Sequence, residues 1–102
     1  METRDANPKW WETADDHKFA LDVLQLGLRR SILRFIDLKI RSKRDIEKNF
    51  GLSSFMAEFH LSMLEKALVV ERFEGEFKIT RTGILYLEKV DANADLSIIT
   101  EH

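Results

Sequence analysis

The sequence predicts a mainly α-helical fold with one small β-hairpin, an α+β architecture in a single domain spanning residues 1–102. Three observations lead to this prediction. Apolar residues recur at helical spacing through most of the first 68 residues, the period then changes to a strand type in two short runs, and a last helical run follows at residues 82–90. A chain of 102 residues fits one domain with one modest hydrophobic core, which we place at residues 19–90.

Two helical runs begin this core. Asn7-Pro8 suits a helix start, because proline is favoured at the first helical position. Residues 15–26 predict a first helix with acidic residues in its first turn. This helix is apolar around much of its circumference, so we expect it to be buried on two sides. Gly27 ends or kinks it, and a second helix is expected at residues 28–37.

A short helix and a longer one follow. Ser42 is expected to cap a helix at residues 43–50, with Asp45 completing a variant of the capping box. Gly51 stands where a helix end favours a left-handed residue. Ser53 or Ser54 then caps a helix that runs to about Leu68.

Two β-prone runs, residues 69–74 and 77–80, flank Gly75-Glu76. Glycine first in a two-residue loop favours a type II′ hairpin. A last helix is expected at residues 82–90, and the tail beyond it either frays or packs on a partner. A short capped helix, a glycine turn, a second helix and a β-hairpin together predict a winged helix-turn-helix.

The helix at residues 53–68 has two distinct faces. Ala57, Leu61, Leu64 and Leu68 share one side at helical spacing, so this side should face the core. His60 lies at the edge of that side, and we interpret it as a packed histidine bonded to the backbone. The opposite side carries Ser54, Phe55, Glu58, Phe59, Ser62 and Glu65.

Basic residues concentrate in one segment, although the whole chain has a formal net charge of −2. Eight arginines and lysines lie between Arg29 and Lys48 against three acidic residues, so this segment carries +5 and the rest of the chain −7. Such a distribution is typical of a phosphate-binding surface. The alternative is an ordinary solvated helical face.

Three segments resemble known transcription regulators. The run from Leu52 to Val70, with its serine pair, His60-Leu61, Leu64 and final valine pair, resembles the recognition helix of ArsR-like winged helix repressors and, more loosely, of MarR-like ones. Arg30 to Ile36 is similar to the arginine-rich helix of that family. Thr80 to Leu87 is similar to the segment after the wing in archaeal winged helix proteins. Ala67-Leu68 stands where the family usually has a glycine before the wing.

This resemblance implies a homodimer with a recognition helix in the major groove and a wing near the DNA backbone. The function we expect is therefore transcription regulation by binding double-stranded DNA, with recognition helix 53–68 and wing 69–80. The dimer is expected to form through residues 10–26 and 82–90, which have more apolar surface than a lone domain needs. Predicted DNA contacts are Arg41, Lys43, Arg44, Lys48, Ser53, Ser54, Phe55, Glu58, Ser62, Arg72 and Lys78.

The outer side of the recognition helix, as we assign it, lacks arginine, lysine, asparagine and glutamine, the residues that usually read bases. Its serines could bond to bases or phosphates, Glu58 could accept from cytosine, and Phe55 and Phe59 could touch thymine methyl groups. Glutamates flank Gly75 at the wing tip, where a basic wing is usual. An alternative therefore stands beside DNA binding, in which the face containing Phe55 and Phe59 binds a protein partner.

Composition and motifs argue against an enzyme. The chain contains no cysteine, which excludes disulfides, thiolate zinc sites and cysteine nucleophiles. No glycine-rich phosphate loop and no nucleophile with a spaced histidine is present. The acidic residues of Asp15-Asp16-His17 suit a helix start, with a zinc or nickel site shared between protomers as the alternative. We expect no catalytic residue, no metal site and no cofactor.

The sequence predicts no membrane segment. No stretch approaches the roughly 20 apolar residues that a spanning helix needs. Residues 1–7 are polar and lack the apolar core of a signal peptide. We therefore expect a soluble, cytoplasmic protein.

Overall fold

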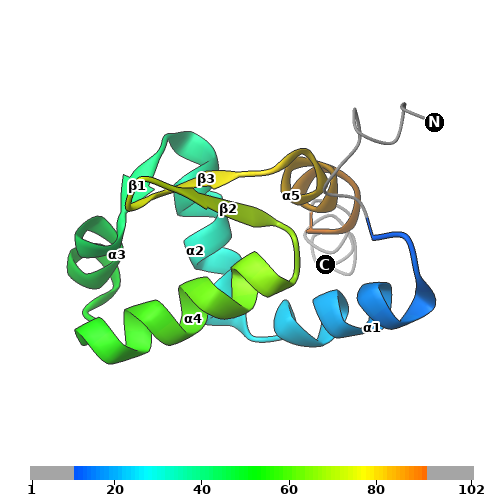
Figure 1. The fold of residues 1–102 in the computed structure, drawn as a ribbon, viewed down its shortest axis with the longest axis horizontal. Coiled ribbons are helices and arrows are strands. Elements are labelled where there is room, and N and C mark those ends of the chain that lie inside the picture. Colours follow the sequence, from blue (N-terminus) through cyan, green and yellow to red (C-terminus); the bar gives the residue numbers. More distant parts are fainter. Residues whose placement is uncertain (1–10, 92–102) are drawn as a thin grey trace, which may run out of the picture.

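The computed structural model describes residues 11–91, which form a mainly helical arrangement around a small antiparallel sheet (Figure 1). The α+β composition predicted from the sequence is confirmed. The expected helix start at Asn7-Pro8, Trp10 in the expected dimer contact, and the tail from residue 92 onward lie outside the described residues. In chain order the elements are α1 (Ala14–Val23), α2 (Gly27–Leu38), β1 (Arg41–Ser42), α3 (Lys43–Phe50), α4 (Ser54–Lys66), β2 (Val70–Phe73), β3 (Glu76–Ile79), α5 (Arg81–Tyr86) and the π-helical segment η2 (Leu87–Asp91).

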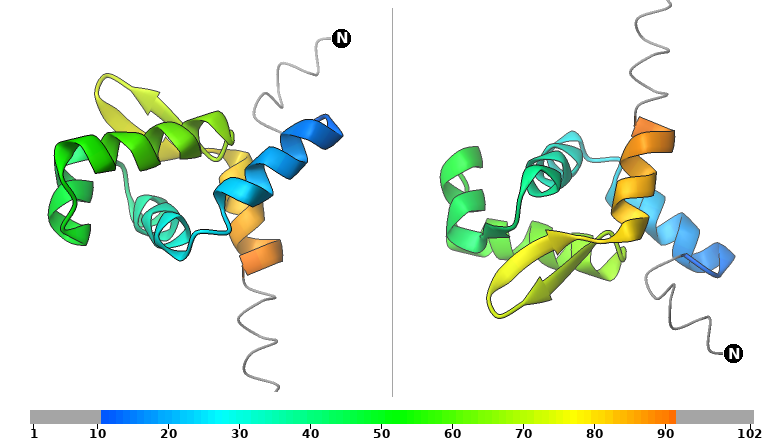
Figure 2. Two further views of the ribbon diagram at one scale, coloured as in Figure 1. Left: turned by 90° about the horizontal axis from the view of Figure 1, so that it is seen from below. Right: turned by 90° about the horizontal axis from the view of Figure 1, so that it is seen from above.

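The elements are distributed along the length of the molecule. Helix α3 lies at one end and helices α1 and α5 lie at the other, as Figures 1 and 2 show. Helix α4 runs between these ends and contacts α1, α2, α3 and β2. The β2–β3 hairpin lies beside α4, and β3 packs on α2. None of the helices within residues 11–91 is long and apolar enough to cross a membrane.

Four helices begin at a hydroxyl side chain that accepts a hydrogen bond from the backbone N–H group three residues later. These residues are Thr13, Ser42, Ser53 and Thr80. The predicted capping box of α3 is confirmed, since the Asp45 carboxylate also accepts from the Ser42 backbone N–H at 2.9 Å. That backbone hydrogen bond lowers the pKa of Asp45. Ser53, rather than Ser54, is the cap of α4.

Helix α4 ends at Lys66, two residues before the end predicted from the sequence. The N–H of Val69 donates to the Leu64 carbonyl at 3.3 Å, and that of Leu68 donates to the Glu65 carbonyl at 3.0 Å. This pair of bonds defines a Schellman motif, with Leu68 at the position that glycine usually occupies. The φ angle of Leu68 is accordingly +67°, in the left-handed region that side chains other than glycine disfavour.

The hairpin turns one residue earlier than predicted. The two-residue loop is Glu74-Gly75, not Gly75-Glu76, and both of its φ angles are positive, at +53° and +81°. This geometry corresponds to a type I′ turn, not the expected type II′ turn. The observed register pairs Val70 with Ile79 on the inner side of the sheet, whereas the predicted loop would pair Val70 with polar Arg81.

The sheet contains a third strand that the sequence did not predict. The two residues of β1 pair antiparallel with β3, which gives the strand order β1-β3-β2. Arg41 and Arg72 both lie opposite Phe77, one on each neighbouring strand. Phe77 is only 1 % exposed, so the inner side of the sheet places two arginines against the edge of the core.

The core is contributed by all the helices and by the hairpin. The prediction that α1 is buried on two sides is wrong. Ala20 and Val23 are buried, whereas Phe19 and Leu21 are more than one third exposed. The helix ends at Val23, and α2 begins at Gly27 after a short turn. Fully buried aliphatic and aromatic side chains of the core include Ile32, Leu33, Ile36, Ile46, Leu61, Leu64, Val69, Val70 and Phe77.

Candidate nucleic-acid interface

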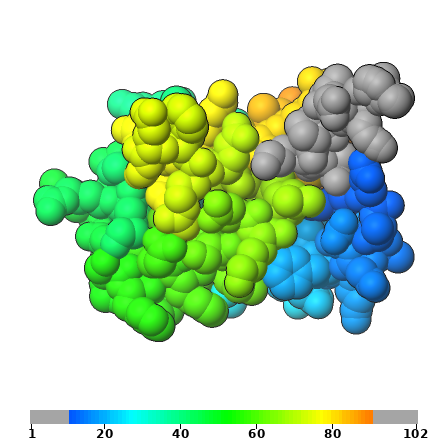
Figure 3. Space-filling model, viewed as in Figure 1, coloured from blue at the N-terminus to red at the C-terminus, as the bar shows by residue number. Residues whose placement is uncertain are grey.

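Helices α3 and α4 are joined by a three-residue turn, Gly51-Leu52-Ser53, and contact one another. Gly51 has a φ of +64°, which confirms the left-handed helix end predicted for it. The ammonium group of Lys43 on α3 donates to the Ser54 hydroxyl at the start of α4 and to the Glu47 carboxylate. These contacts fix α4 relative to α3, and Figure 3 shows both helices and the hairpin on one continuous face.

Helix α4 buries one side and exposes the other, as predicted. Ala57, Leu61 and Leu64 are fully buried, whereas Leu68, which was predicted on the same side, follows the end of the helix and is only partly buried. Phe55 and Phe59 project on the opposite side, one turn apart, with 76 % and 43 % of their surfaces exposed. Lys66, the last residue of the helix, lies on this same outer line at helical spacing. The outer line of α4 is therefore apolar, with a cation at its C-terminal end.

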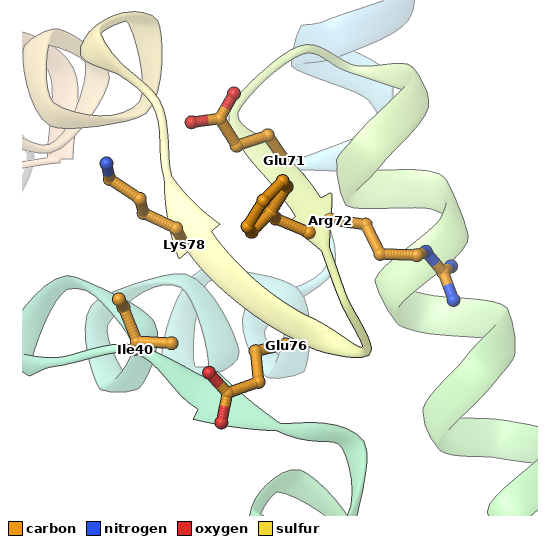
Figure 4. A pocket seen from close by; sticks show the side chains of 6 residues that line it. Ile40, Glu71, Arg72, Glu76 and Lys78 are labelled. Carbon is orange, nitrogen blue, oxygen red and sulfur yellow. The ribbon is translucent and has the colours of Figure 1, made fainter.

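The two glutamates of α4 are directed toward the hairpin. Arg72 of β2 donates to the Glu58 carboxylate at 2.9 and 3.3 Å and to the Glu65 carboxylate at 3.1 and 3.3 Å. Ser62 donates to Glu58 at 2.9 Å, and Arg72 also stacks on Phe77 at 4.7 Å. Figure 4 shows the Arg72 side chain extending toward α4, away from Glu71 and Lys78. The hydrogen bonds from Arg72 and Ser62 lower the pKa of Glu58, and the bond to Glu58 raises that of Arg72.

Arg41 is held within the fold. Its Nε atom donates to the Phe35 carbonyl at 3.0 Å, and its guanidinium lies 3.6 Å from the centre of the Phe35 ring. These contacts tie β1 to the C-terminal half of α2. Arg41, which was predicted from the sequence as a phosphate contact, is thus already engaged with Phe35.

Three of the predicted cationic contacts stay exposed. Arg44 and Lys48 lie one turn apart on α3, on the side opposite to buried Ile46. Lys78 projects from the outer side of β3. Within residues 11–91, these three side chains have no hydrogen bond or ion pair to another residue, so they are available to an anionic ligand.

The outer side of the sheet contains a hollow of about 370 Å³ lined by Ile40, Glu71, Phe73, Glu76 and Lys78, with Arg72 at its margin (Figure 4). Of these residues, Lys78 and Arg72 were predicted from the sequence as DNA contacts, whereas Ile40, Glu71, Phe73 and Glu76 were not. Side chains alternate between the two faces of a strand, so Glu76 and Lys78 of β3 lie on the same face. Ile40 reaches this face only because β1 pairs with β3. Because Glu71 and Glu76 offset the charges of Lys78 and Arg72, the lining of this hollow has no net positive charge.

His60 is buried, as predicted, but its partner is a side chain rather than the backbone. Arg29 on α2 donates from Nε to His60 Nδ1 at 3.1 Å and from Nη1 to the Val23 carbonyl at 3.4 Å. The Arg29 guanidinium also lies 5.4 Å from the centre of the Phe59 ring. Burial, followed by the nearby charge of Arg29, lowers the pKa of His60, so its ring is neutral near pH 7.

No group of three or more histidine, aspartate and glutamate residues suited to a metal ion occurs within residues 11–91. Asp15, Asp16 and His17 are exposed in the first turn of α1, where Thr13 caps the helix.

Comparisons of the chain with protein-family models, with curated proteins and with solved structures found no match.

Proposed function

We propose that this protein is a winged helix-turn-helix transcription regulator that binds double-stranded DNA as a homodimer. The observation that carries the proposal is the exposed side of α4, a helix that contacts both α3, where Arg44 and Lys48 are exposed, and β2 of the hairpin. In this arrangement α4 is the recognition helix and the β2–β3 hairpin is the wing. Such a regulator would act in the cytoplasm, where the DNA is accessible to it.

The order of elements supports the winged helix assignment. A helix, a short strand, two helices joined by a three-residue turn and a hairpin follow one another from α2 to β3. The short strand β1, which directly precedes α3, pairs with β3 of the hairpin. This pairing connects the wing to the helix-turn-helix unit. We assign α4 as the helix that enters the DNA groove, because it is the longest of these helices and has an exposed outer side.

Phosphate contacts are assigned to Arg44, Lys48, Lys66 and Lys78. All four are exposed lysines or arginines of α3, α4 or the wing. Each phosphate contact contributes a slope of about −0.9 to the dependence of the logarithm of affinity on that of salt concentration. Four contacts from each protomer therefore predict a slope of about −4 for each protomer bound.

A homodimer is proposed through the end of the molecule that contains α1 and α5. Phe19 and Leu21 on α1 and Ile84 on α5 are each 37–38 % exposed, and Val90 on η2 is 45 % exposed. A groove of about 350 Å³ lined by Trp11, His17, Tyr86 and Val90, among others, lies beside them. A dimer formed here would leave α3 and the N-terminal part of α4 free, since these lie toward the opposite end (Figure 2).

The test is fluorescence anisotropy of a random-sequence 30-base-pair duplex at two salt concentrations. Wild-type binding should weaken steeply with salt, and Arg44→Glu/Lys48→Glu should lose about tenfold or more in affinity at low salt. Lys18→Glu/Arg81→Glu, at exposed positions of α1 and α5, is the control with the same change in charge. Because these helices form the proposed dimer contact, sedimentation velocity must show that this control has the same oligomeric state as wild type. Absence of binding to duplex DNA at low salt would contradict the proposal.

The second candidate is a protein-interaction module. The observation favouring it is the apolar strip of Phe55, Met56 and Phe59, whose exposed fractions are 76 %, 37 % and 43 %. Exposed apolar strips of this kind are frequent at protein interfaces. The carboxylates of Glu58 and Glu65, although paired with Arg72, also lie near the surface that would approach phosphates. Absence of DNA binding in the test above would favour this second candidate.

A further inference from the structure

The outer line of α4 presents two aromatic rings one helical turn apart. Phe55 projects with 76 % of its surface exposed, while Phe59 is 43 % exposed and rests on Arg29 and His60. A ring that rests on a buried side chain is held in place, so the pair consists of one supported ring and one free ring. Both lie on the side of the helix opposite to buried Leu61.

Apart from exposed Lys66 at its C-terminal end, the polar side chains on the outer side of α4 are already engaged within the protein. Ser54 accepts from Lys43, Ser62 donates to Glu58, and Glu58 accepts from Arg72. The helix has no arginine, asparagine or glutamine that could form a two-bond contact with a base edge. Direct reading of bases by hydrogen bonds is therefore weak on this surface, and the apolar contacts dominate what α4 offers.

We propose that Phe55 and Phe59 recognise the C5-methyl groups of thymine in the major groove. This inference rests on the DNA-binding function proposed above and specifies the bases that α4 prefers. Thymine is the only one of the four bases that presents a methyl group in the major groove, and phenylalanine is among the side chains that contact it. An apolar helix surface alone would not bind the polyanionic DNA backbone. The exposed cations Arg44, Lys48 and Lys66 on α3 and α4 supply the charge that complements this backbone.

The test compares duplexes that differ only in this methyl group. Binding of the 102-residue chain to an alternating A·T duplex is measured beside the same duplex with deoxyuridine in place of thymidine. A second pair compares inosine·cytosine with inosine·5-methylcytosine, which adds a methyl group at the same position of a different base pair. Wild type should bind the methylated member of each pair more tightly, by about fourfold for each methyl group buried.

Variants assign the effect to the helix. Phe55→Ala should lower the affinity ratio of both pairs, because only Phe59 then remains to contact a methyl group, and Phe55→Leu should lower it less. Phe55→Ala/Phe59→Ala should bring the ratio close to one. Phe73→Ala is the matched control, because Phe73 is 71 % exposed but lies on the outer side of the hairpin. It should leave the ratio unchanged.

Three results would overturn the inference. Equal affinity for the methylated and unmethylated duplexes would reject methyl recognition while leaving DNA binding intact. Equal loss of the ratio in Phe55→Ala and Phe73→Ala would reject the assignment to α4. Failure to bind any duplex, including random-sequence DNA at low salt, would reject the proposed function and this inference together.

Discussion

The Nη2 atom of Arg72 lies 2.9 Å from the Oε2 atom of Glu58, and this ion pair joins the hairpin to α4. Glu65 accepts from the same guanidinium at 3.1 Å, so one arginine neutralises part of the charge of two glutamates. All three side chains are about one third or more exposed, with relative exposures of 34–44 %. The cluster therefore remains in contact with solvent and can exchange its partners.

Replacement of Glu58 by glutamine is expected to strengthen DNA binding by about two- to fivefold, the effect of removing one exposed charge interaction. The change removes a negative charge near the proposed phosphate contacts and replaces the ion pair between Glu58 and Arg72 by a neutral hydrogen bond. The free energy of unfolding should fall by no more than about 1 kcal/mol, because exposed ion pairs contribute little. Anisotropy with random duplex DNA measures the first effect and urea denaturation the second.

Glu71→Gln is the control for this prediction. Glu71 is on the other side of β2 from Arg72, so the charge change is the same but the cluster is intact. An equal gain in affinity for both variants would show that only the net charge matters.

The buried pair of Arg29 and His60 predicts a loss of stability in mild acid. The pKa of His60 is lowered from 6.5 in the folded protein, so the unfolded chain binds more protons just below pH 6.5. The contribution of neutral His60 to the free energy of unfolding should therefore be fully present above about pH 6.5 and should decrease as the pH falls below that value. Thermal unfolding followed by circular dichroism between pH 8 and pH 5 measures this dependence.

His60→Asn should flatten this pH dependence, because an asparagine oxygen can accept from Arg29 in place of Nδ1 and does not titrate. His17→Asn is the matched control, since His17 is exposed on α1. If His60→Asn leaves the slope between pH 8 and pH 5 unchanged, the dependence arises from other groups.

The left-handed φ of Leu68 reverses the usual ranking of alanine and glycine. Leu68→Gly should be more stable than Leu68→Ala by about 1 kcal/mol, because glycine adopts positive φ without strain from a Cβ atom. At exposed Lys48, inside α3, the alanine variant should instead be the more stable by about 1 kcal/mol. Urea denaturation of the four variants tests both orders, and the same order at both positions would refute the assigned geometry.

Gly83 provides a close approach between α5 and the hairpin. A Cβ atom at this position would lie 2.4 Å from the Val69 carbonyl oxygen and 2.7 Å from Ile79 Cγ1. Gly83→Ala should therefore lower the free energy of unfolding by about 1–3 kcal/mol. Gly27→Ala is the control, because its Cβ would meet only the Arg30 side chain at 3.6 Å. Comparable unfolding curves for the two variants would contradict the predicted crowding.

The sequence by itself determined the features that depend on neighbouring residues. The capping box of Ser42 and Asp45, the left-handed Gly51 and the buried side of α4 all agree with prediction. Each of these depends on hydrogen bonds or side-chain spacing within about one helical turn, a distance over which a sequence pattern is informative.

Only the tertiary structure decided which polar side chains remain available at the candidate interface. Arg72 finds its glutamates 7 and 14 residues away, and Arg29 finds His60 31 residues away. The strand β1 exists because Arg41 and Ser42 are brought to the edge of β3. Partners of this kind depend on how whole elements pack, since a buried or half-buried charged group must find an acceptor wherever the fold provides one. For that reason, the sequence offered candidate side chains for the proposed interface but did not show which of them the fold itself engages.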